Sequence, residues 1–404
     1  METHLPEALR ATPEGREMER VLRACVHCGF CNTACPTYQL LGDETDGPRG
    51  RIYLMKAALE AGRAGPATRR HLDRCLGCLA CEATCPSGVR YGRLLELARP
   101  RIETLAPTPA PQRLLRWLVR RAFARRGRAA AALAAGRLLR PLLPPALRRT
   151  LPPRPGPVPP WPGPRHRRRV LLPAGCVQSA AAPAIDTATA RLLDGLGLSA
   201  VRPEGDGGCC GALSHHLGAT GEARALARRN VRAWLPYVEA GAPLVLTASG
   251  CAAHVRAYGE LLADDPALAD GARQVAAAVR DPVELLEPHA ARLRPAAGAP
   301  RRIACHEPCT QRHALGLAGR LEALLARVGF ETVPVPEPHL CCGSAGAWSL
   351  LHPRLAGRLR ARKLERLTAG TPEAIATANI GCLLHLAAAA PVPVRHWLEL
   401  VSAG

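Results

Sequence analysis

Short apolar runs alternate with longer amphipathic stretches in the second half of the chain, residues 169–404. Two of the apolar runs, LVLTASGC and AIATANIGC, contain Thr-Ala and have the length of buried strands. The stretches GEARALARRNVRAW and LAGRLRARKLERL have the composition of helices. Alternating strands and helices predict an α/β domain in this half.

The same half contains an internal repeat, which is visible in the spacing of its cysteines. Each copy has a lone cysteine, then a Cys-Cys-Gly (CCG) triplet, then a Gly-Cys pair with a histidine three residues later. The offsets between matching cysteines are 133, 132, 132 and 131 residues. Four matching offsets indicate duplication, so we expect two CCG units, at 169–290 and 291–404.

The first half of the chain has a different pattern. Residues 1–105 contain eight cysteines in two groups, with the helix-like segment RIYLMKAALEAGRAG between them. Residues 106–168 contain no cysteine, and form basic helix-like segments before a proline-rich spacer. We therefore expect a multidomain chain, with a mostly α-helical ferredoxin-like domain, a basic Arg/Pro-rich helical linker and a duplicated α/β CCG domain.

The linker segment QRLLRWLVRRAFARR allows two interpretations. Its leucines and Phe123 could share an apolar side with arginines around it, which would suit an anionic membrane or a partner subunit. Alternatively, the helix packs on its own domains and its arginines face solvent. A basic amphipathic pattern does not decide between them. The residues concerned are Leu114, Leu115, Leu118 and Phe123, with Arg113, Arg116, Arg120 and Arg121.

The large positive net charge would suggest a nucleic-acid partner, but its origin argues against one. The chain of 404 residues has a net charge of +21, but Lys56 and Lys363 are its only lysines among 54 basic residues. This arginine bias accompanies many alanines, glycines and prolines, as GC-rich codon usage produces. Aromatic residues, on which a single-strand binder stacks bases, make up only 3%. We expect no nucleic-acid partner.

The 17 cysteines bear on the cellular compartment in which the protein is expected. No N-terminal segment has the pattern of an export signal, and no run of about 18 apolar residues could span a membrane. In a reducing compartment, cysteines serve metals rather than disulfides. We therefore expect a cytoplasmic protein.

Both N-terminal cysteine groups follow the spacing C-x2-C-x2-C-x3-C-P. In two-cluster ferredoxins, the fourth cysteine of each run ligates the other cluster. Zinc sites usually pair two C-x2-C knuckles instead. We expect two [4Fe–4S] clusters that carry single electrons, one on Cys25, Cys28, Cys31 and Cys85, the other on Cys75, Cys78, Cys81 and Cys35.

The chain shows no catalytic residues of its own. No GxGxxG motif follows a strand and no P-loop is present; the glycine-rich GDGGCCG lacks either pattern. A partner must therefore bind the flavin or nucleotide and supply the substrate chemistry.

The two CCG units offer four thiols each, a donor set that suits zinc or an iron–sulfur centre. Adjacent cysteines reach one centre only at a bend, which the following glycine permits. The alternative is that these cysteines are structural and hold no metal. The candidate ligands are Cys176, Cys209, Cys210 and Cys251 in the first unit and Cys309, Cys341, Cys342 and Cys382 in the second.

Three histidines are candidate auxiliary groups. His254 and His385 could supplement the thiols, or could be ordinary helix-start histidines. His306 could orient Cys309 from behind. Cys305 has no counterpart in the first unit, and we expect it to be a buried small residue.

The doubled ferredoxin motif followed by two CCG units resembles a known family. That family includes heterodisulfide reductase subunits, the small subunit of anaerobic glycerol-3-phosphate dehydrogenase and lactate-utilisation proteins. The narrower likeness is to the iron–sulfur subunits of glycolate oxidase. It is carried by LRACVHCGFCNTACPTYQLLGDETDGPRGRIYLMKAALE, HLDRCLGCLACEATCPSGVRYGRLLE, HLCCGSAGAW, TANIGC and VRHWLELV.

This resemblance implies a multi-subunit enzyme that oxidises glycolate to glyoxylate. FAD-binding oxidase subunits would take a hydride from the substrate, and this chain would relay electrons singly to a membrane acceptor such as a quinone. It would lie in the cytoplasm, with peripheral contact to the inner membrane. The alternative is the equivalent subunit for lactate or glycerol 3-phosphate. A third hypothesis is a zinc-bearing binding protein without redox function.

The sequence departs from these relatives at two places. Heterodisulfide reductase subunits close each CCG unit with C-x2-C, whereas His254 and His385 stand at those positions here. The noncubane cluster and disulfide chemistry of those relatives therefore cannot be carried over. Glu307 stands where close relatives can have another cysteine, which leaves Cys309 as the expected ligand of that segment.

Overall fold

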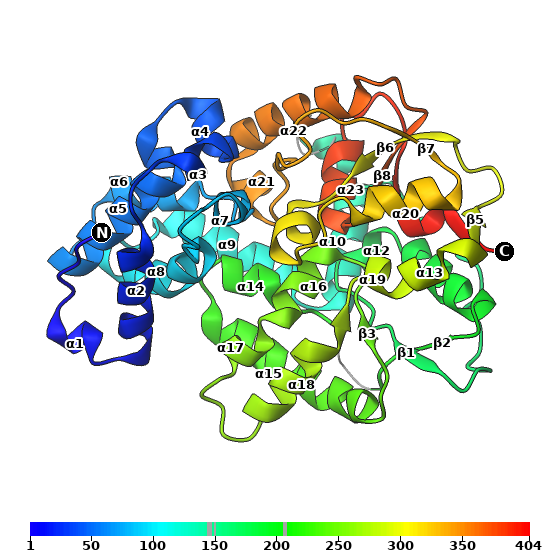
Figure 1. Cartoon of the computed structure of the whole chain (residues 1–404), viewed down its shortest axis with the longest axis horizontal. Coiled ribbons are helices and arrows are strands. Elements are labelled where there is room, and N and C mark those ends of the chain that lie inside the picture. The colour runs from blue at the N-terminus through cyan, green and yellow to red at the C-terminus, as the bar shows by residue number, and fades with distance from the viewer. Residues whose placement is uncertain (144–147, 149–150, 205–207) are drawn as a thin grey trace. The chain divides into compact units, whose positions relative to one another are not determined.

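The computed structural model describes residues 1–143, 148, 151–204 and 208–404 (Figure 1). Parts of the predicted linker, 144–147 and 149–150, and residues 205–207 of GDGGCCG lie outside the described residues. The chain forms two compact units, Met1–Trp117 with His339–Arg360, and Leu118–Pro338 with Ala361–Gly404. The four-part division of the sequence stays a prediction.

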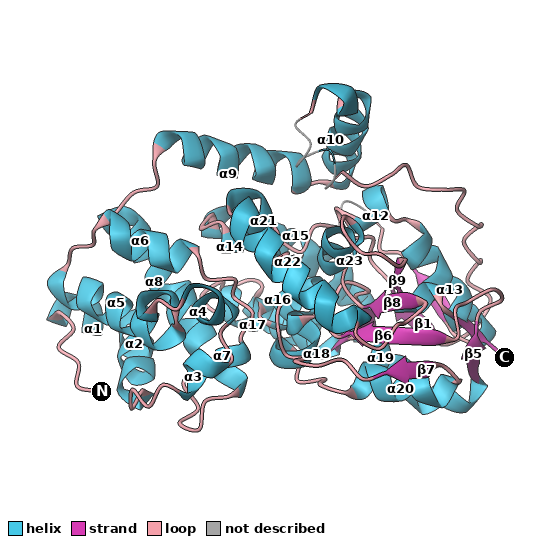
Figure 2. Cartoon of the chain, turned by 90° about the horizontal axis from the view of Figure 1, so that it is seen from above, coloured by secondary structure: helices cyan, strands magenta, loops and turns pink. Residues whose placement is uncertain are grey.

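The first unit is helical, as expected for the ferredoxin-like domain (Figure 2). Its core is formed by apolar side chains that come from several helices, with Met18, Met55 and Leu94 fully buried. Its elements are α1 (Glu7–Arg10), α2 (Pro13–Ala24), α3 (Phe30–Thr33), α4 (Pro36–Leu41), η1 (Glu44–Asp46), α5 (Pro48–Ala61), α6 (Pro66–Asp73), α7 (Ala80–Ala83), α8 (Tyr91–Leu105), α21 (Trp348–Leu351) and the first part of α22 (Pro353–Thr368).

Local sequence signals explain where these helices begin and end. Thr12 caps α2 by accepting a hydrogen bond from the Gly15 amide at 3.0 Å. Helix α5 begins at Pro48, whose ring lacks the amide that a first helical position leaves unpaired, and ends at Gly62 in the left-handed region. Pro36, which follows the fourth cysteine, opens α4 in the same way.

Residues 339–360 come from the second CCG repeat but belong to the first compact unit. Trp348 is buried, packs in a small apolar cluster that includes Leu40 and Leu76, and donates its indole N–H to the Asp73 carbonyl at 3.1 Å. Arg358 of α22 donates to the Leu40 carbonyl at 3.2 Å. The CCG triplet at 341–343 is therefore part of a segment that folds with the ferredoxin-like helices, which the sequence did not predict.

The second unit contains two four-stranded parallel sheets of the same topology (Figure 2, magenta). The orders are β2 (Ser199–Val201), β1 (Arg169–Leu171), β3 (Leu244–Val245), β4 (Val279–Arg280), and β7 (Glu331–Val333), β6 (Arg302–His306), β8 (Ala374–Thr377), β9 (Val394–His396). In the first sheet, β1 lies second in the order and pairs with β2 and β3. In the second sheet, β6 lies second and pairs with β7 and β8. This match confirms the duplicated α/β domain.

Helices surround these sheets, and a short antiparallel pair, β5 (Leu293–Pro295) with β10 (Val401–Ala403), completes the unit. Helix α9 (Ala110–Phe123) runs from the first unit into the second. The others are α10 (Arg126–Leu138), η2 (Arg140–Leu142), α12 (Gln178–Ala181), α13 (Ala184–Gly195), α14 (Ala212–His216), α15 (Thr220–Glu239), α16 (Ser249–Arg256), α17 (Tyr258–Leu261), α18 (Ala269–Ala278), α19 (Pro282–Leu286), η3 (Glu287–Arg292), η4 (Thr310–Ala314), α20 (Arg320–Val328), α23 (Ile380–Ala387) and η5 (Trp397–Glu399).

The two repeats share one hydrophobic core. Val170 and Val245 of the first sheet lie in the same buried cluster as Ile303 of the second, together with Cys305, which is buried as expected. His396, at the end of β9, joins the repeats by a polar contact: its Nε2 donates to the Thr247 carbonyl at 3.0 Å. Its Nδ1 accepts the Leu398 amide at 3.4 Å, so both ring nitrogens of the neutral histidine are used.

His396 makes the stability of this unit depend on pH. Burial lowers its pKa from 6.5 to about 4, although its hydrogen bonds to the main chain oppose the shift. Because the folded state then binds the proton less readily than the unfolded state, the free energy of unfolding falls as pH drops from about 6.5 towards 4. We expect a contribution of roughly 3 kcal/mol, measurable by urea unfolding across this range.

His396→Gln is the matched variant, because glutamine can donate to Thr247 and accept from Leu398 without titrating. It should lose this share of the pH dependence. Equal pH dependence in the variant and the wild-type protein would contradict the assignment.

Candidate metal centres

Two hollows in the first unit are lined by cysteines, five around the first hollow and four around the second. The third cysteine of the second motif, Cys81, also lines the first hollow, and Pro48 and Tyr91 line both. The fourth cysteine of each motif therefore lines the hollow that contains the first three cysteines of the other motif. The cysteines of the first hollow are Cys25, Cys28, Cys31, Cys81 and Cys85, and those of the second are Cys35, Cys75, Cys78 and Cys81.

The loops around the two hollows have the same backbone shape. Left-handed residues occur two and four positions after the first cysteine of each motif: His27 and Gly29 in one, Gly77 and Leu79 in the other. Non-glycine residues such as His27 and Leu79 rarely adopt this conformation, and it concentrates at functional sites. The Gly77 amide donates to the Cys75 sulfur at 3.5 Å.

These features fit an iron–sulfur cluster in each hollow. The Val89 amide also donates to a cysteine sulfur, that of Cys85, at 3.5 Å. Four thiols around one hollow are the donor set of a [4Fe–4S] cluster, and amide hydrogen bonds to its sulfurs are the usual surroundings. The ligand sets themselves stay a prediction.

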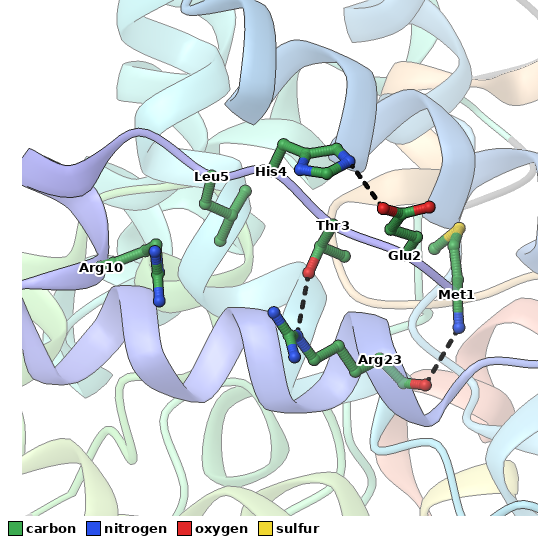
Figure 3. Close-up of a pocket in the computed structure, with 7 residues that line it drawn as sticks. All are labelled: Met1, Glu2, Thr3, His4, Leu5, Arg10 and Arg23. Carbon is green, nitrogen blue, oxygen red and sulfur yellow. Dashed lines mark hydrogen bonds and ion pairs between the residues drawn. The ribbon is translucent and has the colours of Figure 1, made fainter.

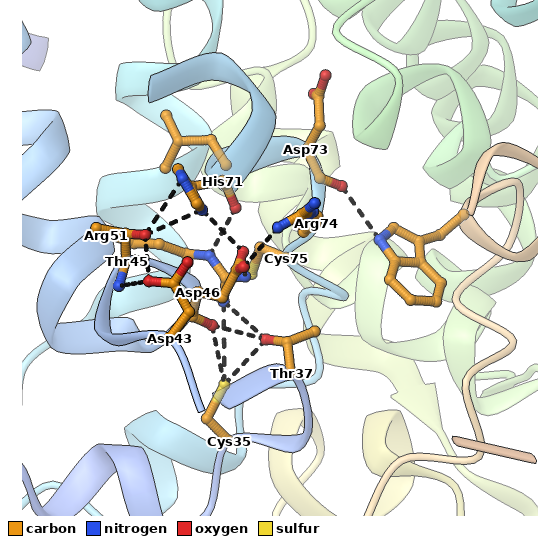
Figure 4. A network of polar contacts seen from close by, with 12 residues as sticks. Cys35, Thr37, Asp43, Thr45, Asp46, Arg51, His71, Asp73, Arg74 and Cys75 are labelled. Atoms are coloured by element: carbon orange, nitrogen blue, oxygen red, sulfur yellow. Dashed lines mark hydrogen bonds and ion pairs between the residues drawn. The ribbon is translucent and has the colours of Figure 1, made fainter. Parts of the chain in front are cut away.

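Polar side chains surround the second hollow. The Tyr91 hydroxyl donates to the Cys75 sulfur at 3.4 Å, and burial, together with the nearby Cys75, raises the pKa of Tyr91. Arg51 lies 3.9 Å from the Cys35 sulfur and pairs with the buried Asp46 at 3.4 Å (Figure 4). These three side chains were not predicted, because nothing in the cysteine spacing marks them.

The first hollow opens towards the surface. Cys28 is exposed, and the neighbouring Val26 and Phe30 are 66% and 60% exposed. Arg49 lies beside this hollow, but its guanidinium pairs with Glu44 at 2.6 Å and remains partly in solvent. The two hollows therefore differ in their solvent access.

The four cysteines of the first CCG repeat come together in pairs. The sulfurs of Cys210 and Cys251 are 3.4 Å apart, and Cys176 donates a hydrogen bond to Cys209. That hydrogen bond lowers the pKa of Cys209 against the effect of burial, and it raises the pKa of Cys176. Thiols that share protons in this way are suited to exchanging them for a metal cation.

Packing and hydrogen bonds fix the backbone of the CCG triplet in the first repeat. Gly211 is left-handed, and a Cβ there would lie 3.2 Å from the Ala223 carbonyl of α15, so glycine is needed at this bend. Tyr258 donates to the Cys210 carbonyl at 2.6 Å, and Asn230 donates to the Cys209 carbonyl at 2.9 Å. Neither side chain was predicted from the sequence, because both donate to main-chain carbonyls and belong to no motif.

The second repeat has the same bend, since Gly343 is also left-handed and packs against α22. Its cysteines are divided, however: Cys341 and Cys342 belong to the first compact unit, and Cys309 and Cys382 to the second. Within the second unit, a ring nitrogen of His306 lies within 4.8 Å of the Cys382 sulfur.

His306 is therefore placed beside Cys382. It is buried, and its Nδ1 pairs with the Thr377 hydroxyl at 2.9 Å; burial lowers its pKa well below 6.5. Its expected role in orienting Cys309 stays a prediction. Glu307, at the position where close relatives can have a cysteine, accepts from Arg312 at 2.8 Å and from the Gly319 amide at 2.9 Å, and so stabilises the loop.

His254 lies in a group of histidines. Its ring is 5.3 Å from that of His215 and 6.3 Å from that of His216, and its buried Nε2 has no hydrogen-bond partner among the described residues. Burial, with the two neighbouring histidines, lowers its pKa well below 6.5. His385 is partly buried on α23. Ligand roles for His254 and His385 stay predictions.

A separate hollow of about 490 Å³ lies under the N-terminal segment (Figure 3). Most of its lining side chains are polar or charged, and none of its lining residues is a cysteine, so it is no part of the cysteine sites. The lining residues are Met1, Glu2, Thr3, His4, Leu5, Arg10 and Arg23.

Comparison with protein families agrees with this geometry. The 4Fe-4S dicluster domain family matches residues 21–89, which include both ferredoxin-type motifs. The cysteine-rich domain family matches twice, at 170–256 and 303–387, which confirms the repeat. Residues in these segments form the two hollows and the two CCG units.

Similar proteins extend the match to nearly the whole chain. The glycolate oxidase iron-sulfur subunit of Escherichia coli is 49% identical over 99% of this chain and 98% of its own. The probable glycolate oxidase iron-sulfur subunit of Bacillus subtilis is 32% identical over 91% of this chain and 89% of its own. Lactate utilization protein A of Geobacillus thermodenitrificans is 28% identical over 54% of this chain and 92% of its own. The chain belongs to the family of glycolate oxidase iron–sulfur subunits.

Proposed function

We propose that the chain relays electrons in a complex that oxidises glycolate to glyoxylate. FAD-binding partner subunits take the hydride, and the chain passes electrons singly to a membrane acceptor such as a quinone. One observation carries the relay: two adjacent hollows, both lined by cysteines, share Cys81, Pro48 and Tyr91 as a common wall. Clusters held there would be close enough for rapid electron transfer. The likeness to glycolate oxidase subunits over the whole chain supports glycolate as substrate.

The relay predicts what the loss of one ligand does. Cys25→Ala or Cys75→Ala should abolish reduction of the acceptor, because each removes a thiolate from one cluster, while the flavin partners remain reducible by glycolate. The measurements are iron content, about eight irons in the wild-type complex, and acceptor reduction. Cys305→Ala is the control, since Cys305 lies in the shared apolar core. Unimpaired electron flow in Cys75→Ala would contradict the relay.

Lactate or glycerol 3-phosphate is the alternative donor. The lactate-utilisation relatives match only about half of this chain, which favours glycolate. The deciding experiment is purification of the chain with its partners, followed by a screen of the three substrates with an artificial acceptor. Oxidation of lactate or glycerol 3-phosphate without glycolate would overturn the proposed substrate.

The first CCG repeat is proposed to hold a further metal on Cys176, Cys209, Cys210 and Cys251, supported by their paired sulfurs. Cys210→Ser should therefore lower the metal content below that of the wild-type chain without removing the eight irons of the ferredoxin-type sites. Elemental analysis of anaerobically purified protein measures this. An unchanged metal content would show that these cysteines are structural.

Contact with an anionic membrane is proposed for α9, four of whose apolar residues face outwards. Trp117 and Leu118 are 48% and 49% exposed, with Leu114 and Leu115 beside them. Arg116 faces inwards instead, and its side chain, only 12% exposed, pairs with Asp73 at 2.8 Å. This is the reverse of the arrangement in which a linker helix packs its apolar side on its own domains.

The positive charge around α9 favours a membrane with anionic lipids. Residues 104–185 contain sixteen arginines and no aspartate or glutamate. An exposed apolar stripe with tryptophan, within a basic segment, is suited to the interface of an anionic bilayer. No helix among the described residues is both long enough and apolar enough to cross a bilayer.

The double variant W117A/L118S should lose most binding to vesicles that contain anionic lipid, measured by flotation. Higher salt should weaken binding of the wild-type chain, because arginine–headgroup attraction is screened. Leu350→Ser, a 38% exposed leucine on α21, is the control and should bind like the wild-type chain. If the double variant instead releases the flavin partners and still binds vesicles, α9 is a subunit interface and not a membrane surface.

A further inference from the structure

We propose that Arg51 and Tyr91 raise the reduction potential of the cluster on Cys35, Cys75, Cys78 and Cys81 above that of the other cluster. The inference rests on the proposed function, because it needs both clusters in the two hollows. It gives the relay a direction, from the hollow that contains the exposed Cys28 to the hollow beside the buried Arg51. With a cluster bound in each hollow, one electron would pass from the first to the second, and no bond or proton would need to change.

Tyr91 acts through a hydrogen bond. It is the first residue of α8, only 3% exposed, and its hydroxyl donates to the Cys75 sulfur at 3.4 Å. A cluster with four thiolates is anionic and gains further negative charge on reduction. A donor to its sulfur therefore stabilises the reduced state more than the oxidised state, which raises the potential. Because Tyr91 is buried, water does not weaken this bond.

Arg51 acts through charge. It is 1% exposed, and its guanidinium reaches towards the Cys35 sulfur at 3.9 Å while Nε donates to the His71 carbonyl at 2.8 Å (Figure 4). Its counter-ion, Asp46, is fully buried and is shared with Arg74, which donates to it at 2.7 Å. Two arginine cations thus face one carboxylate. The surplus positive charge lies beside Cys35, where it favours reduction.

The surroundings of the first hollow are different. Its neighbouring cation, Arg49, is 34% exposed and has Glu44 as its own counter-ion at 2.6 Å. Cys28 is exposed, so solvent screens charges near this hollow more than near Arg51. The fixed charge and the hydroxyl donor therefore act mainly on the second cluster.

The test is a redox titration of the anaerobically purified complex, followed by electron paramagnetic resonance of both clusters. Cys78→Ser, which replaces a ligand of the second cluster, identifies its signal. Tyr91→Phe removes only the hydroxyl and should lower the potential of that cluster alone. We expect the equilibrium constant for transfer from the first cluster to the second to fall about tenfold, or about 59 mV for one electron.

Two further variants complete the test. Arg51→Gln should lower the same potential further, because it removes a charge. Tyr53→Phe is the matched control: Tyr53 is 57% exposed near His27, and its hydroxyl loss should shift neither potential. If Tyr91→Phe retains eight irons but leaves both potentials unchanged, or lowers them equally, the inference is wrong while the relay stands. A wild-type complex without the two clusters would overturn the proposed function itself.

Discussion

The fourth cysteine of each ferredoxin-type motif is the constraint on which the first unit depends. Three cysteines of a motif lie on one short loop, but the fourth lines the hollow of the other motif. The 39 residues between Cys35 and Cys75 must therefore leave the first hollow and return beside it. Helices α5 and α6 form this excursion, and α5 packs with α2 and α8 in one core.

The backbone of each CCG unit is also shaped by its cysteines, through a bend at the CCG triplet. Two adjacent cysteines can reach one centre only at a bend, and a left-handed glycine against a helix provides such a bend in both repeats. In the first repeat, Asn230 and Tyr258 then satisfy the two cysteine carbonyls, so the bend is fixed by buried hydrogen bonds. The duplicated sheets share a core, which makes the second unit one folded body rather than two.

Much of this architecture follows from the sequence, because ligand spacing and duplication are local or periodic properties. The doubled cysteine motif indicated the hollows, and equal offsets indicated the paired sheets. The contacts of Arg51 and Tyr91 could not be derived, since they depend on how α5 and α8 approach the cysteine loops. The α9 pattern showed that the helix is amphipathic, but periodicity does not say which side faces inwards. The inclusion of residues 339–360 in the first unit depends on long-range packing around Trp348, which no motif marks.

His27 and Leu79 give the cysteine loops a property of their own. Each occupies a backbone region that costs a non-glycine residue about 1–3 kcal/mol. His27 lies two positions after the first cysteine of its motif, and Leu79 lies four positions after the first cysteine of the other motif. Such conformations persist only where other interactions impose them. Bonds from sulfur to iron would supply that restraint, so metal insertion and the final shaping of these loops become a single event. Without the clusters, these loops would relax to less strained conformations. A chain that lacks its clusters would then be less completely folded and more open to degradation by proteases.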